Sequence, residues 1–153
     1  VYSYQHRISF LRLADAICMA MPIGLGLVRI GNFLNGELYG RPTDGTWGFI
    51  FPTDPYGFTR HPSQLYESIF EGFFLFILLL FISAKNNKHG VISGSFLLAY
   101  GLIRFFIEYF RQPDSHMGFV ALQLSMGQLL SIPMVIIGLI LLTKSLRRNE
   151  AIS

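Results

Sequence analysis

A polar stripe interrupts one of the apolar stretches of the sequence. Four side chains share one face of a helix with about 100° per residue: Tyr100, Arg104, Glu108 and Arg111. An arginine guanidinium stays ionised and binds phosphate oxygens through paired hydrogen bonds, so the stripe could hold an anionic headgroup. An Arg104–Glu108 pair that only joins neighbouring helices fits the spacing equally well, and both interpretations stay open.

A second polar segment, residues 29–41, is rich in glycine and asparagine. Its candidate site residues are Arg29, Asn32, Asn35, Glu37 and Gly40. Glycine and asparagine disfavour a regular helix, so we expect an irregular backbone here. Such backbone is tolerated at membrane depth only inside protein or beside a cavity, which favours a site. Asparagine and glutamate that merely bond turn amides remain the alternative.

A third polar segment, residues 60–67, is predicted to lead into a helix. Proline is favoured as a first helical residue, which places Pro62 at the helix start and His61 near the cap. Four polar side chains share one face of this helix: Gln64, Glu67, Ser68 and Glu71. Their acidity suits the helix dipole near the first turn. For His61 we favour a capping or loop role over catalysis, because spacing places no partner beside it.

No pattern in the sequence is typical of metal or nucleotide chemistry. There is no paired Asp motif for magnesium, no Cys/His ligand set for zinc and no Gly-x-x-x-x-Gly-Lys loop. We therefore expect neither a metal nor a cofactor. The basic residues are too dispersed for a nucleic-acid partner. The one cysteine, Cys18, lies among apolar residues, where a buried hydrophobe is favoured over a nucleophile.

Composition places these segments in a membrane protein. Hydrophobic residues make up 52% of the chain and charged residues 14%, against about 25% charged in soluble domains. Residues 115–143 contain no Asp, Glu, Lys or Arg, and about 20 apolar residues suffice to cross a bilayer. The predicted fold is an all-α integral membrane protein with an irregular Gly/Asn-rich segment and an outer loop. About four transmembrane helices are expected, at residues 15–30, 63–84, 91–110 and 120–143.

The distribution of basic residues predicts the orientation, because short cytoplasmic loops concentrate Lys and Arg. Seven basic residues fall on one side of a four-span arrangement: Arg7, Arg12, Lys85, Lys88, Lys144, Arg147 and Arg148. The other side receives Arg41, Arg60 and Arg111, balanced by Asp44, Asp54 and Asp114. Both chain ends are therefore expected in the cytoplasm and the loop of residues 40–62 outside.

Three sequence blocks resemble the prolipoprotein diacylglyceryl transferase family. The blocks are GLVRIGNFLNGELYGR (26–41), RHPSQLYE (60–67) and YGLIRFFIEYFRQPD (100–114), and residues 125–128 also fit. The resemblance implies a bacterial inner-membrane enzyme of about seven spans. It also implies an N-terminal region with a His-Gly-Gly segment, which these 153 residues do not contain. Residues 1–153 are thus expected to be a single membrane domain, the C-terminal part of a longer enzyme.

The resemblance implies transfer of the diacylglyceryl group from phosphatidylglycerol to the lipobox cysteine thiol of a prolipoprotein. Membrane lipids are the other expected partners, and no cofactor is implied. Arg29 and Arg104 would clamp the phosphate, with Glu37 and Glu108 orienting them. Asn32, Asn35 and Tyr100 would bond the headgroup or backbone, and Gly40 would permit a turn. The general base is not identified, and His61 is a weaker candidate than the missing histidine.

Two other classes of function remain open at this stage. A transporter segment would use the same buried Arg/Glu stripe as a substrate pathway. An inactive fragment or lipid-binding membrane module would hold phosphatidylglycerol without turning it over. Solute flux would indicate the transporter. Lipid binding without thioether formation would indicate the inactive fragment or lipid-binding module.

Overall fold

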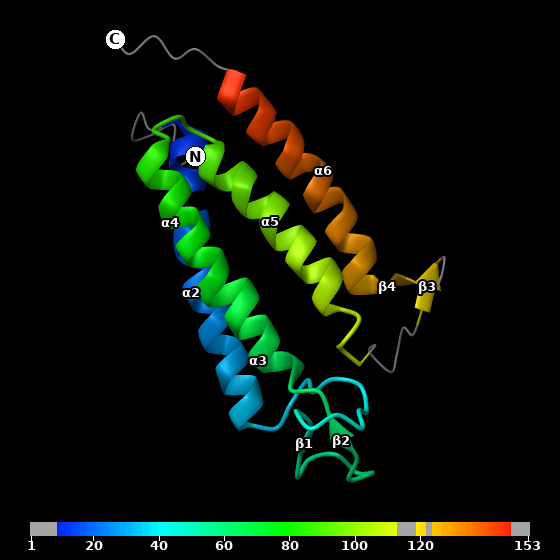
Figure 1. The fold of residues 1–153 in the computed structure, drawn as a ribbon. Helices are drawn as coiled ribbons and strands as arrows, with labels where there is room; N and C mark the ends of the chain where they lie inside the picture. Colours follow the sequence, from blue (N-terminus) through cyan, green and yellow to red (C-terminus); the bar gives the residue numbers. More distant parts are fainter. Residues whose placement is uncertain (1–8, 113–118, 122–123, 148–153) are drawn as a thin grey trace.

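The computed structural model describes residues 9–112, 119–121 and 124–147, which form a bundle of long helices with a loop at one end (Figure 1). The helical elements are α2 (Phe10–Leu34), α3 (Ser63–Glu67), η1 (Ser68–Phe74), α4 (Leu75–Lys85), α5 (Val91–Ile107) and α6 (Met126–Arg147). Two short antiparallel pairs complete the described chain: β1 (Phe49–Ile50) with β2 (Thr59–Arg60), and β3 (Phe119–Ala121) with β4 (Leu124–Ser125).

Three of the helical stretches are long and apolar enough to cross a membrane. They are Phe10–Leu34, Ser63–Lys85 and Met126–Arg147, the second being α3, η1 and α4 in one continuous run. The fourth, α5, has 17 residues, or about 26 Å, at the lower limit for a span. It packs along α6 and α2 (Figure 1). The prediction of an all-α integral membrane protein is confirmed, with three full-length helices and a shorter fourth.

Apolar side chains cover the outside of the bundle. Large apolar side chains are exposed on each full-length helix, for example Leu27, Leu34, Phe73, Phe81, Ile136 and Ile137. Three buried apolar side chains, Leu75, Leu79 and Phe96, form the central apolar cluster. Fourteen polar or charged residues of the described chain are buried, among them four acidic residues on helices or their caps: Asp15, Glu67, Glu71 and Glu108. The exposed apolar surface of these helices is stable when lipid covers it, while the polar groups stay inside the protein.

Helix α2 continues through the segment that we expected to be irregular. It includes Gly31 and Asn32 and ends at Leu34, so the prediction of an irregular backbone from Arg29 onward is wrong for its first six residues. A glycine inside a helix costs only about 1 kcal/mol, which packing elsewhere along a 25-residue helix outweighs. The irregular part begins at the C-cap, Asn35.

Helix α6 begins six residues later than predicted, at Met126 instead of residue 120. The backbone before it pairs as β3 and β4. Ser125 and Gln128 form a capping box: the Gln128 N–H donates to Ser125 Oγ at 3.3 Å, and the Ser125 N–H donates to Gln128 Oε1 at 3.1 Å. This reciprocal pair fixes the start of the helix.

Helix α5 ends at Ile107, three residues before the predicted boundary. The next amides, of Tyr109 and Phe110, bond to carbonyls three residues back, at 3.2 and 2.9 Å. This tightened turn replaces the last helical turn that the polar stripe suggested.

Glycines set the closest helix contacts. Gly72 of η1 lies against Gly26 of α2, and a Cβ added at Gly72 would come within 2.7 Å of the Gly26 Cα. Gly138 of α6 is packed in the same way against the backbone of Leu98 on α5. Small residues are what let membrane helices approach each other this closely.

At the opposite end from the loop, α2 and α5 are joined through a carboxylate. Asp15 accepts hydrogen bonds from the Gly90 N–H at 2.6 Å and from the Ser93 N–H and Oγ at 2.8 and 2.7 Å. Asp15 on α2 therefore caps the N-terminus of α5.

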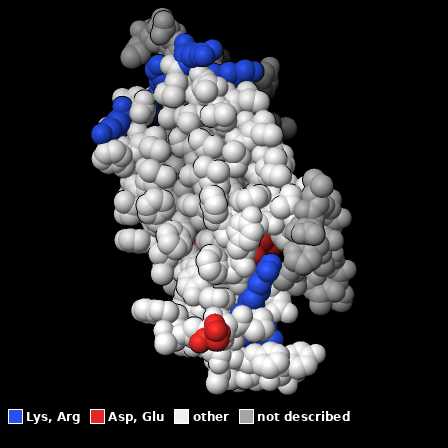
Figure 2. Space-filling view, turned by 45° about the vertical axis from the view of Figure 1, so that its right-hand side comes forward, with Lys and Arg blue, Asp and Glu red and all other residues white. Residues whose placement is uncertain are grey.

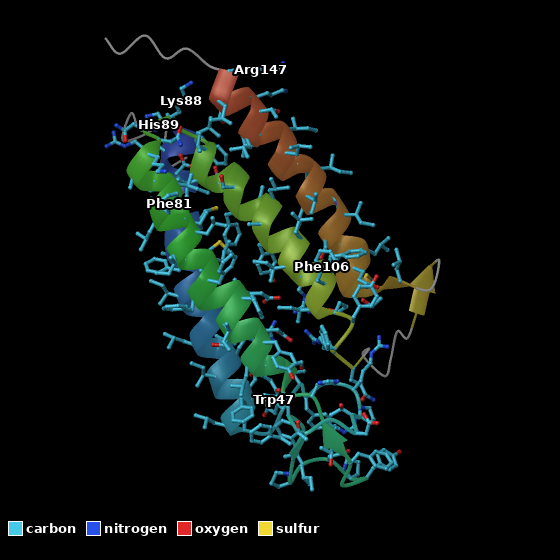
Figure 3. The ribbon with its side chains drawn as sticks, viewed as in Figure 1. Trp47, Phe81, Lys88, His89, Phe106 and Arg147 are labelled. Atoms are coloured by element: carbon cyan, nitrogen blue, oxygen red, sulfur yellow. The ribbon has the colours of Figure 1, made fainter. Side chains whose placement is uncertain are left out.

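Most basic side chains on the face shown in Figure 2 gather at this end of the bundle. In Figure 3, Lys88, His89 and Arg147 lie there, while Trp47 lies in the loop at the other end. Arg7 and Arg148 lie outside the described residues. The two ends of the bundle thus differ in charge, and which of them faces the cytoplasm stays a prediction.

We expect Gly72→Ala to lower the free energy of unfolding by about 1–3 kcal/mol, because its methyl group would push η1 away from α2. Gly24→Ala is the matched control, since nothing lies within 4 Å of a Cβ there. Thermal unfolding of the purified full-length protein in detergent measures both. Equal melting temperatures for the two variants would contradict this packing.

Candidate active site

Two arginines from different helices meet at one carboxylate. Glu67 Oε2, on α3, lies 2.5 Å from Arg29 Nε of α2 and 3.2 Å from Arg104 Nη1 of α5. The Glu67 side chain is 1% exposed. Residues from three elements are thus joined through a single oxygen atom.

Arg104 has two further acidic partners. Its Nη1 lies 3.4 Å from Glu71 Oε1 on η1, and its Nη2 lies 3.3 Å from Glu108 Oε2 at the C-cap of α5. The Glu108 carboxyl group in turn lies against Gly127, where an added Cβ would be 2.5 Å from Oε2. Gly127 is in the first turn of α6, whose dipole favours a negative charge. The cluster therefore involves every spanning stretch of the described chain.

Carboxyl groups outnumber guanidinium groups in this cluster. Two guanidinium groups face three carboxylates, Glu67, Glu71 and Glu108. One oxygen of each carboxylate accepts no hydrogen bond among the described residues. The arginine side chains, at 15% and 13% exposed, are more accessible than the carboxylates, at 0–7%. The two arginines are therefore the more accessible members of the cluster.

Glu67, and not Glu37, is the glutamate in contact with Arg29. The prediction that Glu37 orients an arginine is wrong, because no ion pair in the described part of the chain joins Glu37 to Arg29 or Arg104. The Glu37 side chain is exposed, and its backbone carbonyl accepts a hydrogen bond from Gln64 Nε2 at 2.6 Å. The prediction that Glu108 contacts Arg104 agrees with the structure.

Glu67 and Glu71 are the site residues that sequence reasoning missed. Their shared helix face with Gln64 is confirmed, and all three are buried. We ascribed their acidity to the helix dipole, whereas the structure pairs both with arginines. The available signal was an acidic face on an apolar helix, which needs basic partners from elsewhere.

No hydrogen bond or ion pair among the described residues joins the remaining polar candidates, Tyr100, Asn32 and Asn35, to the cluster. Tyr100 stacks on Phe96 at a ring distance of 5.5 Å. Asn32 accepts the Glu37 N–H through its backbone oxygen at 2.8 Å, and Asn35 caps α2. Their bonding to a headgroup stays a prediction.

Gly40 allows neighbouring backbone segments to pack closely against it, and it does not form the turn that we expected. Its N–H donates to the His61 carbonyl at 2.8 Å, and an added Cβ would lie 2.5 Å from the Phe110 carbonyl oxygen. Positive φ angles occur instead at Gly36 (68°) and Leu38 (56°). Gly40 thus lets three backbone segments meet.

His61 lies in the loop, beside aromatic rings. Its Nδ1 is 3.4 Å from the Tyr66 hydroxyl, and its ring is 5.5 Å from that of Phe110 in an edge-to-face arrangement. Pro62 is the N-cap of α3 and Ser63 its first residue, one position later than predicted. No hydrogen bond or ion pair connects His61 to the arginine cluster among the described residues. The loop role is the one that these contacts support.

Arg60 is a buried arginine outside the cluster, which we had counted only as a loop charge. Its Nε and Nη2 donate to the Asp54 carboxylate at 2.6 and 3.0 Å, and its Nη1 donates to Gln112 Oε1 at 2.5 Å. Its guanidinium carbon lies 4.7 Å from the Tyr39 ring centre. Hydrogen bonding from Arg60 holds the pKa of Asp54 below its ordinary value. This fully bonded pair stabilises the loop.

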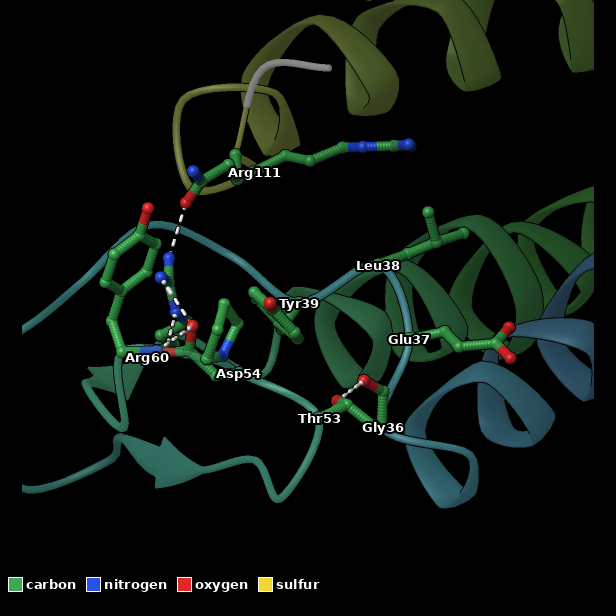
Figure 4. A pocket seen from close by; sticks show the side chains of 11 residues that line it. Gly36, Glu37, Leu38, Tyr39, Thr53, Asp54, Arg60 and Arg111 are labelled. Carbon is green, nitrogen blue, oxygen red and sulfur yellow. Dashed lines mark hydrogen bonds and ion pairs between the residues drawn. The ribbon is translucent and has the colours of Figure 1, made fainter. Parts of the chain in front are cut away.

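The Arg60–Asp54 pair borders an open cavity of about 740 Å³ (Figure 4). Other lining residues include Glu37, Tyr39, Tyr56 and Arg111. In Figure 4 the Glu37 carboxylate points away from Arg60 and Asp54. The cavity wall is linked to the cluster, because Gln64 bonds the Glu37 carbonyl and precedes Glu67 by one helical turn.

Cys18 packs against the apolar cluster of Leu75, Leu79 and Phe96. This position agrees with a small hydrophobe and offers no support for a nucleophile. Within the described residues, no group of three or more His, Cys, Asp or Glu side chains is arranged to hold a metal ion.

A comparison with known protein families decides the assignment. Residues 1–144 match the family model described as prolipoprotein diacylglyceryl transferase. The chain belongs to this family. The resemblance based on the three sequence blocks is thereby confirmed.

Curated relatives carry the name phosphatidylglycerol–prolipoprotein diacylglyceryl transferase. The relative from Geobacter sulfurreducens is 50% identical over 145 residues, covering 95% of this chain and 55% of the relative. Those from Aliivibrio fischeri and Chlorobaculum tepidum are 48% and 47% identical, covering 97% and 98% of this chain and 53% and 52% of the relatives. The chain spans about half the length of the curated relatives it matches.

The three blocks that resemble the diacylglyceryl transferase family converge in the structure. Arg29 comes from the first block, Glu67 from the second, and Arg104 with Glu108 from the third. The ion-pair cluster is where they meet. This convergence makes the cluster the candidate active site of the family member.

We expect low pH to destabilise the loop of residues 40–62, because protonation of Asp54 removes its ion pair with Arg60. Because its pKa is lowered in the folded protein, the Arg60–Asp54 pair contributes stability above the ordinary carboxyl pKa of about 3.9 and loses it as the pH falls through the lowered value. We expect pepsin to cleave the wild-type loop increasingly from pH 4 to pH 2, and to cleave Asp54→Asn throughout. The exposed Asp44→Asn should behave as wild type. Equal protection of Asp54→Asn would contradict the loop role.

Proposed function

We propose that the full-length protein transfers the diacylglyceryl group of phosphatidylglycerol to the lipobox cysteine thiol of prolipoproteins. Membership of the transferase family and the names of its relatives support this reaction. The observation that carries the proposal is the pairing of Arg29 and Arg104 at one buried carboxylate, at the junction of the three family blocks.

The chemistry requires positive charge at the leaving phosphate. The cysteine sulfur, as thiolate, forms a bond to the glyceryl carbon, and the bond from that carbon to the phosphate oxygen breaks. Glycerol phosphate leaves with the electron pair, and the thiol proton passes to a base or to water. The phosphate charge thus rises from −1 in the diester to −2 in the monoester. Guanidinium groups that bind the phosphate stabilise this developing charge more than the ground state.

The depth of the cluster suits a lipid headgroup. Arg29 lies five residues before the end of α2 and Arg104 three residues before the end of α5, which is about 5–8 Å along each helix axis. Both are therefore close to the loop-bearing end of the bundle. A phosphodiester lies at this level when the acyl chains remain in the bilayer.

The membrane setting is part of the same proposal. We place the enzyme in the bacterial cytoplasmic membrane, with the basic end and both chain ends at the cytoplasm by the positive-inside rule. The cluster and the loop of residues 40–62 then face outward, where prolipoproteins emerge. Residues 1–153 form a single membrane domain, the C-terminal part of an enzyme of about seven spans.

Arg29→Lys and Arg104→Lys in the full-length enzyme test the phosphate site. Lysine keeps the charge but loses the two-pronged hydrogen bonding, so we expect transfer to fall at least about 100-fold in each variant. Thioether formation on a lipobox peptide, with phosphatidylglycerol in vesicles, provides the measurement. Arg12→Lys, exposed at the opposite end of α2, is the matched control and should retain activity.

Near-wild-type transfer by both cluster variants would overturn the phosphate assignment. Wild-type protein that binds phosphatidylglycerol without forming the thioether would instead identify a lipid-binding module. Solute flux in liposomes without lipid turnover would identify a transporter.

A further inference from the structure

We propose that Glu67 is a positioning residue that fixes Arg29 and Arg104 relative to each other for the transition state. The inference rests on the proposed transferase function, and it assigns Glu67 a role in catalysis through the two arginines. Glu67 itself does not touch the reacting atoms.

Glu67 is the one acidic side chain of the described residues that contacts both arginines. Its Oε2 atom is 2.5 Å from Arg29 Nε and 3.2 Å from Arg104 Nη1. Glu71 and Glu108 contact Arg104 alone, at 3.4 and 3.3 Å. The mutual orientation of the two guanidinium groups therefore depends on one carboxylate oxygen.

The backbone around Glu67 is attached on both sides. Upstream, Ser63 Oγ donates to the Leu38 carbonyl at 3.2 Å and Gln64 Nε2 donates to the Glu37 carbonyl at 2.6 Å. Downstream, Ser68 Oγ donates to the Gly26 carbonyl of α2 at 3.1 Å. The carboxylate is thus held on a rigid support, as a positioning role requires.

The charge of Glu67 opposes simple binding of an anion. A carboxylate beside an arginine weakens its attraction for a phosphodiester in the ground state. Glu67 is useful to the reaction only if the aligned pair stabilises the transition state, where the phosphate acquires its second negative charge. Removing the carboxylate should therefore lower kcat without raising the KM for phosphatidylglycerol.

Steady-state kinetics of full-length Glu67→Gln test this separation, with phosphatidylglycerol in vesicles and a lipobox peptide. Glutamine keeps the shape of the side chain but removes its charge, so we expect kcat to fall at least tenfold with KM unchanged or lower. Glu67→Asp keeps the charge on a shorter side chain and should retain more of kcat. Glu71→Gln, which affects Arg104 alone, should lose less than Glu67→Gln.

A wild-type kcat in Glu67→Gln, or a raised KM with unchanged kcat, would overturn the positioning role. If Glu67→Gln fails to fold, the same comparison in Glu67→Asp decides: a lowered kcat at unchanged KM supports the role and a raised KM alone overturns it. An inactive wild-type protein would refute the proposed function instead, so the two failures are distinguishable.

Discussion

The buried ion-pair cluster is the constraint on which the rest of the structure depends. An ionised side chain inside a membrane protein is costly unless it is paired, and removing one partner of a buried pair costs about 3–5 kcal/mol. Arg29 and Glu67 lie on different helices, so their ion pair forms only if α2 and α3 meet at this level, and the contact of Glu67 with Arg104 brings α5 to the same point. The cluster thus determines helix contacts as well as a site.

The features around the cluster bring its members to the required distance. Gly26 and Gly72 allow α2 and η1 to touch next to Glu71, and Gly127 leaves room for the Glu108 carboxylate at the start of α6. The loop is attached to the same end through Gly40, which no larger residue could replace without displacing neighbouring backbone. Small residues in this protein therefore leave the space that the charged groups need in order to meet.

Sequence patterns predict what is local. Apolar runs predict the spans, and helical spacing identifies Arg104 with Glu108 on one face. The partnership of Arg29 with Glu67, instead of Glu37, depends on how α2 packs against α3, which spacing within one segment does not contain. The late start of α6 is different, because the Ser-x-x-Gln capping box of Ser125 and Gln128 is a local signal that our prediction of residue 120 overlooked.

The most direct test is a density map of the full-length protein with phosphatidylglycerol bound. The account predicts the lipid phosphate between Arg29 and Arg104, within hydrogen-bond distance of both guanidinium groups, about 2.7–2.9 Å. A phosphate bound elsewhere, for example in the cavity beside Arg60 and Arg111, with both cluster arginines still on their carboxylates, would contradict it.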